Sequence, residues 1–344
     1  MDAQTATGAV PGQRGARSGY DHRIVSSVTF GPSAVTVRVP AKVNLQLAVG
    51  PVRADGFHGV VTVYQAISLF DEVTVRSATQ RTPVLVSGED AASVPTGPTN
   101  LASKAVTALA RATGQRDRGR ASVQIEIRKR IPVAAGLAGG SADAAAALVA
   151  CNELWRTGLT QSELSAIAAG LGSDVPFALA GGTSVGRGRG EQLTAALVAG
   201  TYHWALAFAA GGLSTPEVYA ACDRLRAARG GAARVPPPEL SGPLMTALRS
   251  SDPMAVGRHL VNDLQPAAIS LRPELRRALS DGREFGAVGA MVSGSGPTCL
   301  FLAKDAAHAR EIAVSLTGAG SCRAAAVASG PVPGAAIVGV GEPA

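Results

Sequence analysis

IPVAAGLAGGSAD, residues 131–143, joins a predicted strand to a predicted helix, and it is the most informative stretch of the chain. Before it, Val123, Ile125 and Ile127 alternate with polar residues, which is the period of a half-buried strand at residues 122–128. After it, residues 144–155 form an alanine-rich run typical of a helix. A loop that feeds a helix N-terminus presents free N–H groups and the positive end of the helix dipole at one point. Because glycine also lets an anion approach the backbone closely, the stretch predicts a cradle for nucleotide phosphates.

The glycine content of the chain leaves a simpler alternative open for this loop. Glycine makes up 41 of 344 residues, well above the usual proportion of about 7 per cent, so a Gly/Ala cluster arises by chance more often here. Tight helix packing or a plain turn therefore stands beside phosphate binding as an alternative. Two familiar phosphate loops do not fit, since no Gly-Lys-Ser/Thr ends the stretch and its glycine spacing differs from the dinucleotide-binding fingerprint.

Length and composition restrict the class of protein. The chain is long enough for two domains, and its hydrophobic content of 46% supplies a core. The net charge of +7 suits an anionic ligand, yet the arginines are scattered and not interleaved with aromatics, so nucleic acid is not an expected partner. No apolar run reaches the ~18 residues that cross a membrane, so no membrane association is expected.

Cysteine usage and the N-terminal composition indicate the compartment. The four cysteines are far apart with no C-x-x-C pair, and Cys151 and Cys299 stand in apolar segments where buried thiols are expected. The histidines show no zinc spacing. Residues 1–33 lack the apolar stretch of a secretory signal and have the composition of a disordered extension. These features predict a cytoplasmic protein.

Hydrophobic periodicity over the remaining chain predicts a mixed α+β fold. Helices are expected at residues 100–111, 160–171, 255–259, 273–280 and 306–316, and Thr160 with Glu163 fits a capping box. A glycine-rich hairpin is expected at residues 181–190. Because strands and helices do not alternate strictly, two sheets with helices packed on them are favoured. Further strands are expected at residues 34–40, 43–49, 60–67, 72–76, 203–208, 287–292, 299–303 and 323–328.

Four further constellations carry groups suited to chemistry. Lys42 and Asn44 share one face of a strand, since strand side chains repeat every second residue. Residues 55–58 place an aromatic ring beside an imidazole in a turn, Asp174 stands between a helix end and a proline, and residues 293–298 form a second strand-to-glycine turn. Each alone is better explained as a strand edge, a loop, a cap or a turn. Their joint presence in this order is much harder to explain that way.

Taken together, these segments resemble the GHMP kinases (galactokinase, homoserine, mevalonate and phosphomevalonate kinases). Residues 132–145 resemble the second motif of that superfamily and residues 293–298 the third. Residues 41–45, 53–58 and 172–176 are similar to the A-K-[IV]-N-L, R-x-D-G-[YF]-H and G-x-D-[VI]-P segments of one branch. Members of that branch phosphorylate the 2-hydroxyl of 4-diphosphocytidyl-2-C-methyl-D-erythritol on a route to isoprenoids. The resemblance covers about residues 34–335.

The resemblance implies a two-domain GHMP kinase fold. Residues 34–198 would form an N-terminal ATP-binding domain like domain 2 of ribosomal protein S5, and residues 199–335 an α+β C-terminal substrate domain. ATP and Mg²⁺ would be the cofactors, and a cytidine diphosphate sugar alcohol the small-molecule substrate. The ligands of Mg²⁺ and the oligomeric state stay open at this point.

The resemblance also implies roles for individual residues. Lys42 and Asp174 match the active-site pair, in which the aspartate orients or deprotonates the attacking hydroxyl. Phe57 and His58 match residues that hold the cytosine ring, Tyr219 in the segment that starts at Thr215 would cover its other face, and Asn44 would lie near the methylerythritol hydroxyls. The residues that would bind the ATP phosphates are Pro132, Val133, Ala134, Ala135, Gly136, Leu137, Ala138, Gly139, Gly140, Ser141 and Ala142.

Departures from the family pattern leave some points open. Alanine stands at several loop positions where glycine is frequent, and Asp143 stands where asparagine is common. A carboxylate there would repel phosphates unless it points away or helps to hold Mg²⁺. Two other functions also remain possible: another small-molecule GHMP kinase, of homoserine or mevalonate type, and a non-catalytic protein that binds RNA or a nucleotide on the same fold.

Overall fold

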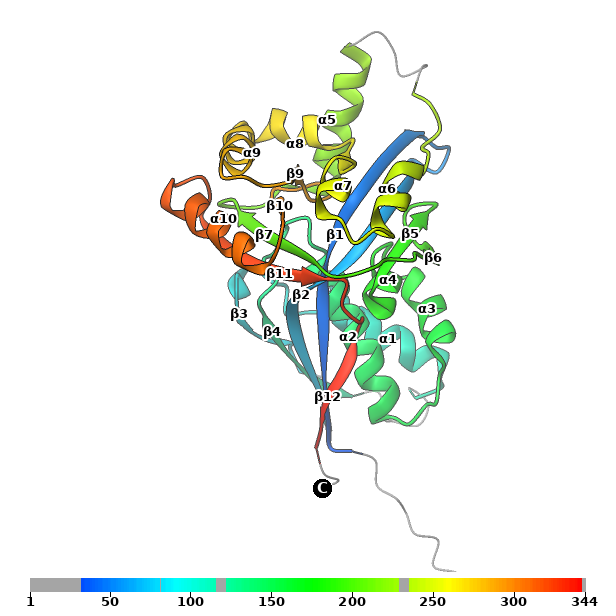
Figure 1. Ribbon diagram of the computed structural model, residues 1–344. Coiled ribbons are helices and arrows are strands. Elements are labelled where there is room, and N and C mark those ends of the chain that lie inside the picture. The colour runs from blue at the N-terminus through cyan, green and yellow to red at the C-terminus, as the bar shows by residue number, and fades with distance from the viewer. Residues whose placement is uncertain (1–31, 81, 116–121, 229–234, 342–344) are drawn as a thin grey trace, which may run out of the picture. The chain divides into compact units, whose positions relative to one another are not determined.

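The structure, a computed structural model, describes residues 32–80, 82–115, 122–228 and 235–341. Apart from Pro32 and Ser33, the extension predicted at residues 1–33 lies outside this part of the chain. The described chain forms two sheets with helices packed on them, which confirms the predicted α+β class (Figure 1).

The first sheet is built on a long antiparallel hairpin of β1 (Ala34–Val52) and β2 (His58–Ser77). The hydrophobic alternation predicts two strands in each of these segments, but each is continuous. Register shifts between Pro40 and Ala41 and between Asn44 and Gln46 interrupt the pairing without ending the strands. The hairpin therefore places the part of β1 that carries Lys42 beside the part of β2 that carries Tyr64.

The other strands of the first sheet are β3 (Leu85–Gly88), β4 (Val123–Lys129), β5 (Thr183–Arg187), β6 (Gln192–Ala195), β8 (Val261–Asn262) and β12 (Ala336–Val340). The main order is β12-β1-β2-β4-β3. β5 and β6 form the glycine-rich hairpin predicted near residues 181–190, and β5 pairs with β2. β8 and β12 lie after residue 198 in the chain, yet both pair with β1 in the first sheet. The predicted domain boundary near residue 198 therefore stays a prediction.

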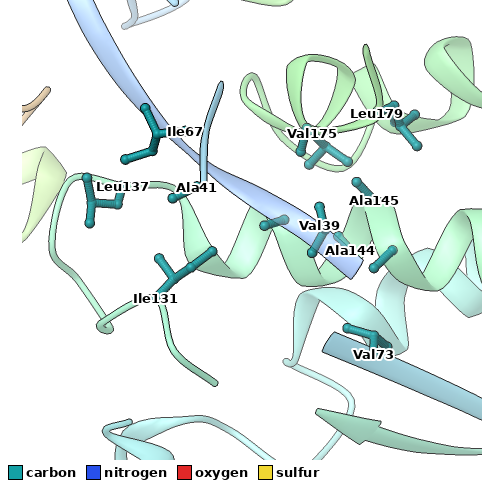
Figure 2. Packing of buried hydrophobic residues seen from close by; sticks show 14 of the residues in the cluster. Val39, Ala41, Ile67, Val73, Ile131, Leu137, Ala144, Ala145, Val175 and Leu179 are labelled. Atoms are coloured by element: carbon teal, nitrogen blue, oxygen red, sulfur yellow. The ribbon is translucent and has the colours of Figure 1, made fainter. Parts of the chain in front are cut away.

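The helices of the first half are α1 (Leu101–Ala112), α2 (Gly139–Leu154), α3 (Gln161–Ala169) and α4 (Val175–Ala180). The predicted capping box of Thr160 and Glu163 is present at the start of α3. α2 packs directly on β1 and β2, and α1 and α4 pack beside it. Its alanines make this close packing possible: in Figure 2, Ala144 and Ala145 lie among Val39 and Val73 of the sheet.

The second sheet has the antiparallel order β11-β7-β10-β9. Its strands are β7 (Tyr202–Phe208), β9 (Gly289–Val292), β10 (Cys299–Ala303) and β11 (Ala324–Gly330). α10 packs on β7, β10 and β11, and α9 packs on β9 and β10. The remaining elements are η1 (Ala91–Ser93), α5 (Thr215–Ala228), α6 (Gly242–Leu248), α7 (Pro253–Gly257), α8 (Gln265–Leu271), α9 (Glu274–Glu284) and α10 (Ala306–Gly318).

Most predicted elements are present, with two kinds of difference. The helix after the glycine loop begins at Gly139, whereas the alanine run predicts a start at residue 144. Periodicity also misses α5, α6, α8 and the short strands β3 and β12. α6 and α8 each have seven residues, too few for a helical period to stand out, and all five β12 residues are exposed, so no alternation marks that strand. Cys151 and Cys299 are buried, as predicted.

Candidate active site

The glycine loop rises from the end of β4 and enters α2 through left-handed backbone at Gly136 and Ala138. A Cβ on Gly136 would lie 2.2 Å from the carbonyl oxygen of Ser293, so glycine is required at this close approach. Because α2 starts at Gly139, the N–H groups of its first residues have no acceptor within the helix. Gly139, Gly140 and Ser141 line a cleft, which is the geometry of an anion site.

The cleft has a volume of about 780 Å³ and brings together residues from most of the chain. One wall is the glycine loop, and the opposite wall comes from the β1–β2 hairpin, the start of α4 and the first turns of α5. The residues from outside the loop with side chains suited to binding or catalysis are Lys42, Asn44, Phe57, His58, Tyr64, Asp174, Arg189, Thr215, Tyr219, Asp223 and Ser295.

Lys42 and Asp174 meet at the centre of this cleft, as the sequence predicts. The Lys42 Nζ lies 3.8 Å from Asp174 Oδ2 and donates to the carbonyl oxygen of Gly136 at 3.1 Å. Asp174 immediately precedes α4, but its side chain does not cap that helix. Tyr64 donates its hydroxyl hydrogen to Asp174 Oδ1 at 2.9 Å, so the carboxylate is held from two sides.

Asn44 lies beside Lys42 on the same strand face, as the alternation predicts. Its Oδ1 accepts from Lys42 Nζ at 2.8 Å, and its Nδ2 donates to Thr62 Oγ1 at 2.8 Å. The amide therefore orients the lysine. A direct contact of Asn44 with the substrate stays a prediction.

Burial changes the acidity of these groups. Desolvation lowers the pKa of Lys42, and the nearby Asp174 carboxylate offsets part of that change. Desolvation, with Asp174 adding to it, raises the pKa of Tyr64 well above its usual value. Tyr64 therefore remains a hydrogen-bond donor to Asp174 across the neutral pH range.

A second group of residues lies at the outer end of the cleft. His58 Nε2 lies 3.0 Å from Asp223 Oδ1, and the His58 ring centroid lies 5.0 Å from that of Tyr219. Phe57 is 53% exposed, and the guanidinium carbon of Arg189 lies 5.2 Å from its ring centroid.

Thr215 stands at the start of α5 on the inner side of this group. Its Oγ1 lies 3.0 Å from Ser295 Oγ, so the two hydroxyls share a hydrogen bond. The structure thus brings the predicted cytosine-binding residues Phe57, His58 and Tyr219, together with Thr215, into the same cleft as Lys42 and Asp174.

Asp143 lies beneath the glycine loop and does not line the cleft. It is 3% exposed, its Oδ2 accepts from Lys129 Nζ at 2.8 Å, and Lys129 also donates to Asp71. Burial raises the pKa of Asp143 to about 7, although Lys129 opposes the shift. Of the two explanations left open for Asp143, the structure supports the one in which its carboxylate points away from the phosphates.

The predicted loop residues divide into two groups. Leu137 and Ala142 are buried beneath the loop, and Pro132 and Val133 border a smaller cavity on its other side. Contact of these four with ATP stays a prediction. The loop residues that line the cleft are Ala134, Ala135, Gly136, Ala138, Gly139, Gly140 and Ser141.

Several residues in or below the cleft carry no local sequence signal. Tyr64 sits in an ordinary strand pattern, and Asp71 stands beside Glu72 within β2. Lys129 is the last residue of β4, a position where solvated charges are common. Asp223 is one of several charged residues on α5.

Two further features are absent from the part of the chain that the structure describes. Among them there is no group of three or more His, Cys, Asp or Glu side chains that could hold a metal ion. Within the same residues, no helix is both long and apolar enough to cross a membrane.

Comparison with known proteins identifies relatives of this chain. The model of the GHMP kinases N terminal domain matches residues 100–182, and that of the GHMP kinases C terminal matches residues 244–322. The 4-diphosphocytidyl-2-C-methyl-D-erythritol kinase of Thermobifida fusca is 53% identical over 89% of this chain and 99% of its own length. The protein of the same name from Nocardia farcinica is 55% identical over 89% and 97%.

Solved structures agree with these relatives. A crystal structure of 4-(cytidine 5'-diphospho)-2C-methyl-D-erythritol kinase matches with a TM-score of 0.68 and 32% identity, over 85% of this chain and 98% of the other. A homoserine kinase from Cytophaga hutchinsonii matches with a TM-score of 0.66 over 89% and 98%, at 19% identity, which supports the fold alone.

Proposed function

Because this chain belongs to the GHMP kinases and, among them, to the 4-diphosphocytidyl-2-C-methyl-D-erythritol kinases, we propose that its cleft transfers the γ-phosphoryl group of ATP to the 2-hydroxyl of 4-diphosphocytidyl-2-C-methyl-D-erythritol. The observation that carries the proposal is the position of Lys42 and Asp174. They lie in the same cleft as the N-terminal amides of α2, so an acceptor and a polyphosphate can meet there.

The ATP phosphates would bind at the glycine loop. The N–H groups of Gly139, Gly140 and Ser141 lack intrahelical acceptors and lie at the positive end of a 16-residue helix. Phosphoryl transfer requires positioning and charge stabilisation more than covalent chemistry. A rigid set of backbone donors supplies both for the nucleotide.

The acceptor hydroxyl would be activated by Asp174. The carboxylate accepts the hydroxyl proton as the oxygen attacks the γ-phosphorus and ADP leaves. Tyr64, at 2.9 Å from Oδ1, leaves Oδ2 for that proton. Lys42 stands 3.8 Å from Oδ2, where it can stabilise the charge that develops on the transferred group.

Mg²⁺ would arrive with the nucleotide in this proposal. It usually binds one or two carboxylates together with substrate phosphates and waters. Its ligands would be phosphate oxygens and waters, because Asp174 Oδ1 accepts from Tyr64 and Oδ2 is kept for the hydroxyl proton. When bound, the ion would neutralise charge on the phosphates.

The cytidine end of the substrate would lie in the outer cleft. Phe57 and Tyr219 offer two aromatic faces for a flat base, and His58 offers a polar edge between them. Base–aromatic stacking contributes about 1–3 kcal/mol per base. Such binding, remote from the reacting hydroxyl, would hold that hydroxyl near Asp174.

An assay of ADP release tests the proposal. ADP should form with ATP and the cytidine substrate and not with homoserine or mevalonate at the same concentrations. Turnover of homoserine or mevalonate instead would show a different GHMP kinase. Absence of turnover with all three acceptors would favour a binding protein on this fold.

A further inference from the structure

A buried network of three charged side chains lies directly behind the glycine loop. Lys129 Nζ donates to Asp143 Oδ2 at 2.8 Å and also to Asp71 Oδ2. The side chains of Asp71, Lys129 and Asp143 are 0%, 2% and 4% exposed. None of them lines the cleft, so the network does not contact the bound phosphates in the proposed site.

The network forms hydrogen bonds with the backbone at the start of the loop. Asp71 Oδ1 accepts from the backbone N–H of Arg130 at 2.6 Å and from that of Ile131 at 2.9 Å. One β2 carboxylate therefore fixes both the Lys129 side chain and the point where the chain leaves β4. Hydrogen bonds that involve a charged partner and a buried backbone amide are among the stronger ones in proteins.

The same network also contacts the end of the loop, where α2 begins. Asp143 lies in the second turn of α2, and its bond to Lys129 ties the start of this helix to β4. Lys129 Nζ lies only 3.0 Å from where a Cβ on Gly139 would be, so the ammonium group sits against the backbone of the first helical residue. The position of the Lys129 ammonium group therefore limits how far the backbone of Gly139 can move away from the cleft.

The crest of the loop is held by different contacts. Lys42 Nζ and Ser293 Oγ both donate to the Gly136 carbonyl oxygen, and Leu213 N donates to that of Ala134. These contacts come from the acceptor side of the cleft and from the second half of the chain. The buried network joins the two ends of the loop to each other through charged side chains, and the side chain of Ile131 also packs against Gly139.

We propose that Asp71, Lys129 and Asp143 are positioning residues that set the orientation of the α2 N-terminal amides for the ATP phosphates. The inference rests on the proposed function, in which those amides bind ATP. A network of charges buried only for stability would not need to bridge both ends of a ligand-binding loop. Misplacement of binding groups by about 1 Å can cost about 100-fold in rate, so such a device has a measurable effect.

Two substitutions in the intact protein test this role. Lys129→Met removes the ammonium group and keeps an unbranched stem of four heavy atoms. Asp143→Asn keeps the shape and an oxygen acceptor for Lys129, so it preserves the fold if the first variant is poorly folded. We expect the KM for ATP to rise about tenfold or more in Lys129→Met and less in Asp143→Asn, while the KM for the cytidine substrate changes little.

A matched control separates positioning from stability. Leu316 is fully buried on α10, which packs on the second sheet, and Leu316→Ala should lower the melting temperature without changing the loop. We expect its KM for ATP to remain that of the unmodified protein. Amide hydrogen exchange at residues 131–143 should accelerate in Lys129→Met and stay slow in Leu316→Ala.

The outcomes are distinct. An unchanged KM for ATP and unchanged loop exchange in both Lys129→Met and Asp143→Asn would overturn the positioning role, whatever their melting temperatures. If the unmodified protein itself releases no ADP with the cytidine substrate, the proposed function fails instead. Loop exchange in the variants still tests the network in that case, because it does not depend on turnover.

Discussion

The two sides of the cleft are built by different means. The side proposed for the nucleotide consists of backbone amides from one continuous stretch, residues 131–143, and the charged side chains beneath it, those of Asp71, Lys129 and Asp143, are buried. The acceptor side consists of side chains from distant segments, among them Lys42, Tyr64 and Asp174. In the proposed site, buried charges hold the backbone of the nucleotide side in place. On the acceptor side, the charged side chains themselves take part in the reaction.

This difference separates the expected effects of substitution. A change on the acceptor side should remove a reacting group or a substrate contact and act on kcat or on the KM for the cytidine substrate. A change beneath the loop should act on the KM for ATP. The predictions below test this separation.

The largest effect is expected at the reacting pair. Asp174→Asn and Lys42→Ala should each reduce kcat by at least about 100-fold, because they remove the proton acceptor and the charge-stabilising donor. Steady-state ADP release, with circular dichroism to verify folding, measures this. Full activity in either folded variant would contradict the assignment of the pair.

A smaller effect is expected at the outer end of the acceptor side. Tyr219→Ala removes one aromatic face and should raise the KM for the cytidine substrate about tenfold, with little change in the KM for ATP. Titration of each substrate at saturation of the other separates the two constants. An equal rise in both would count against a clamp for the base.

Substitution of Tyr64 tests whether the orientation of the Asp174 carboxylate affects the rate. Tyr64→Phe removes the hydrogen bond to Asp174 and should lower kcat about three- to tenfold, the equivalent of about 1 kcal/mol. The control is Tyr202→Phe, because that hydroxyl is also buried but donates to the Leu248 carbonyl oxygen outside the cleft. If both variants keep the same kcat, Tyr64 has no role in orienting Asp174.

The smallest effect is a pH dependence of stability that arises beneath the loop. Burial raises the pKa of Asp143 from 3.8 to about 7, so the folded protein holds this proton more tightly than the unfolded chain. The resulting stabilisation is complete below about pH 4 and is lost as the pH rises towards 7. The raised pKa of Lys129 acts only near its own alkaline range.

Asp143→Asn removes this titration. From pH 4 to 7 the melting temperature of the unmodified protein should therefore fall relative to that of Asp143→Asn. Thermal unfolding at pH 4, 5.5 and 7 measures the difference. As a control, Asp281→Asn changes a more exposed carboxylate, in an ion pair with Arg277 on α9, and should show no such trend. Parallel curves for all three proteins would show that Asp143 stays ionised.

Local sequence features predicted one side of the cleft better than the other. The strand, loop and helix around residues 131–143 follow from alternation, glycine content and an alanine run, and all three are present. The helix start was placed too late because the glycines at residues 139 and 140 have low intrinsic helix propensity. Tertiary packing of α2 on the first sheet overrides that propensity.

On the acceptor side, the prediction depended on resemblance to a family. Periodicity placed Lys42 and Asn44 on one strand face but could not bring Asp174 within 3.8 Å of Lys42. It also could not identify Tyr64 or Asp223, because a tyrosine in a strand and an aspartate on a helix are ordinary. Such partners depend on which strands pair and in which register.

The sequence by itself determined the α+β class and the glycine loop between a strand and a helix, because these depend on short-range patterns of polarity, glycine and helix-forming residues. Only the tertiary structure established the partners of the charged groups: Asp174 with Lys42 and Tyr64, and Asp143 with Lys129. Residues far apart in the chain meet only after the sheet register and helix packing are set. A charge at the end of a strand can therefore be buried behind the cleft, as Lys129 is.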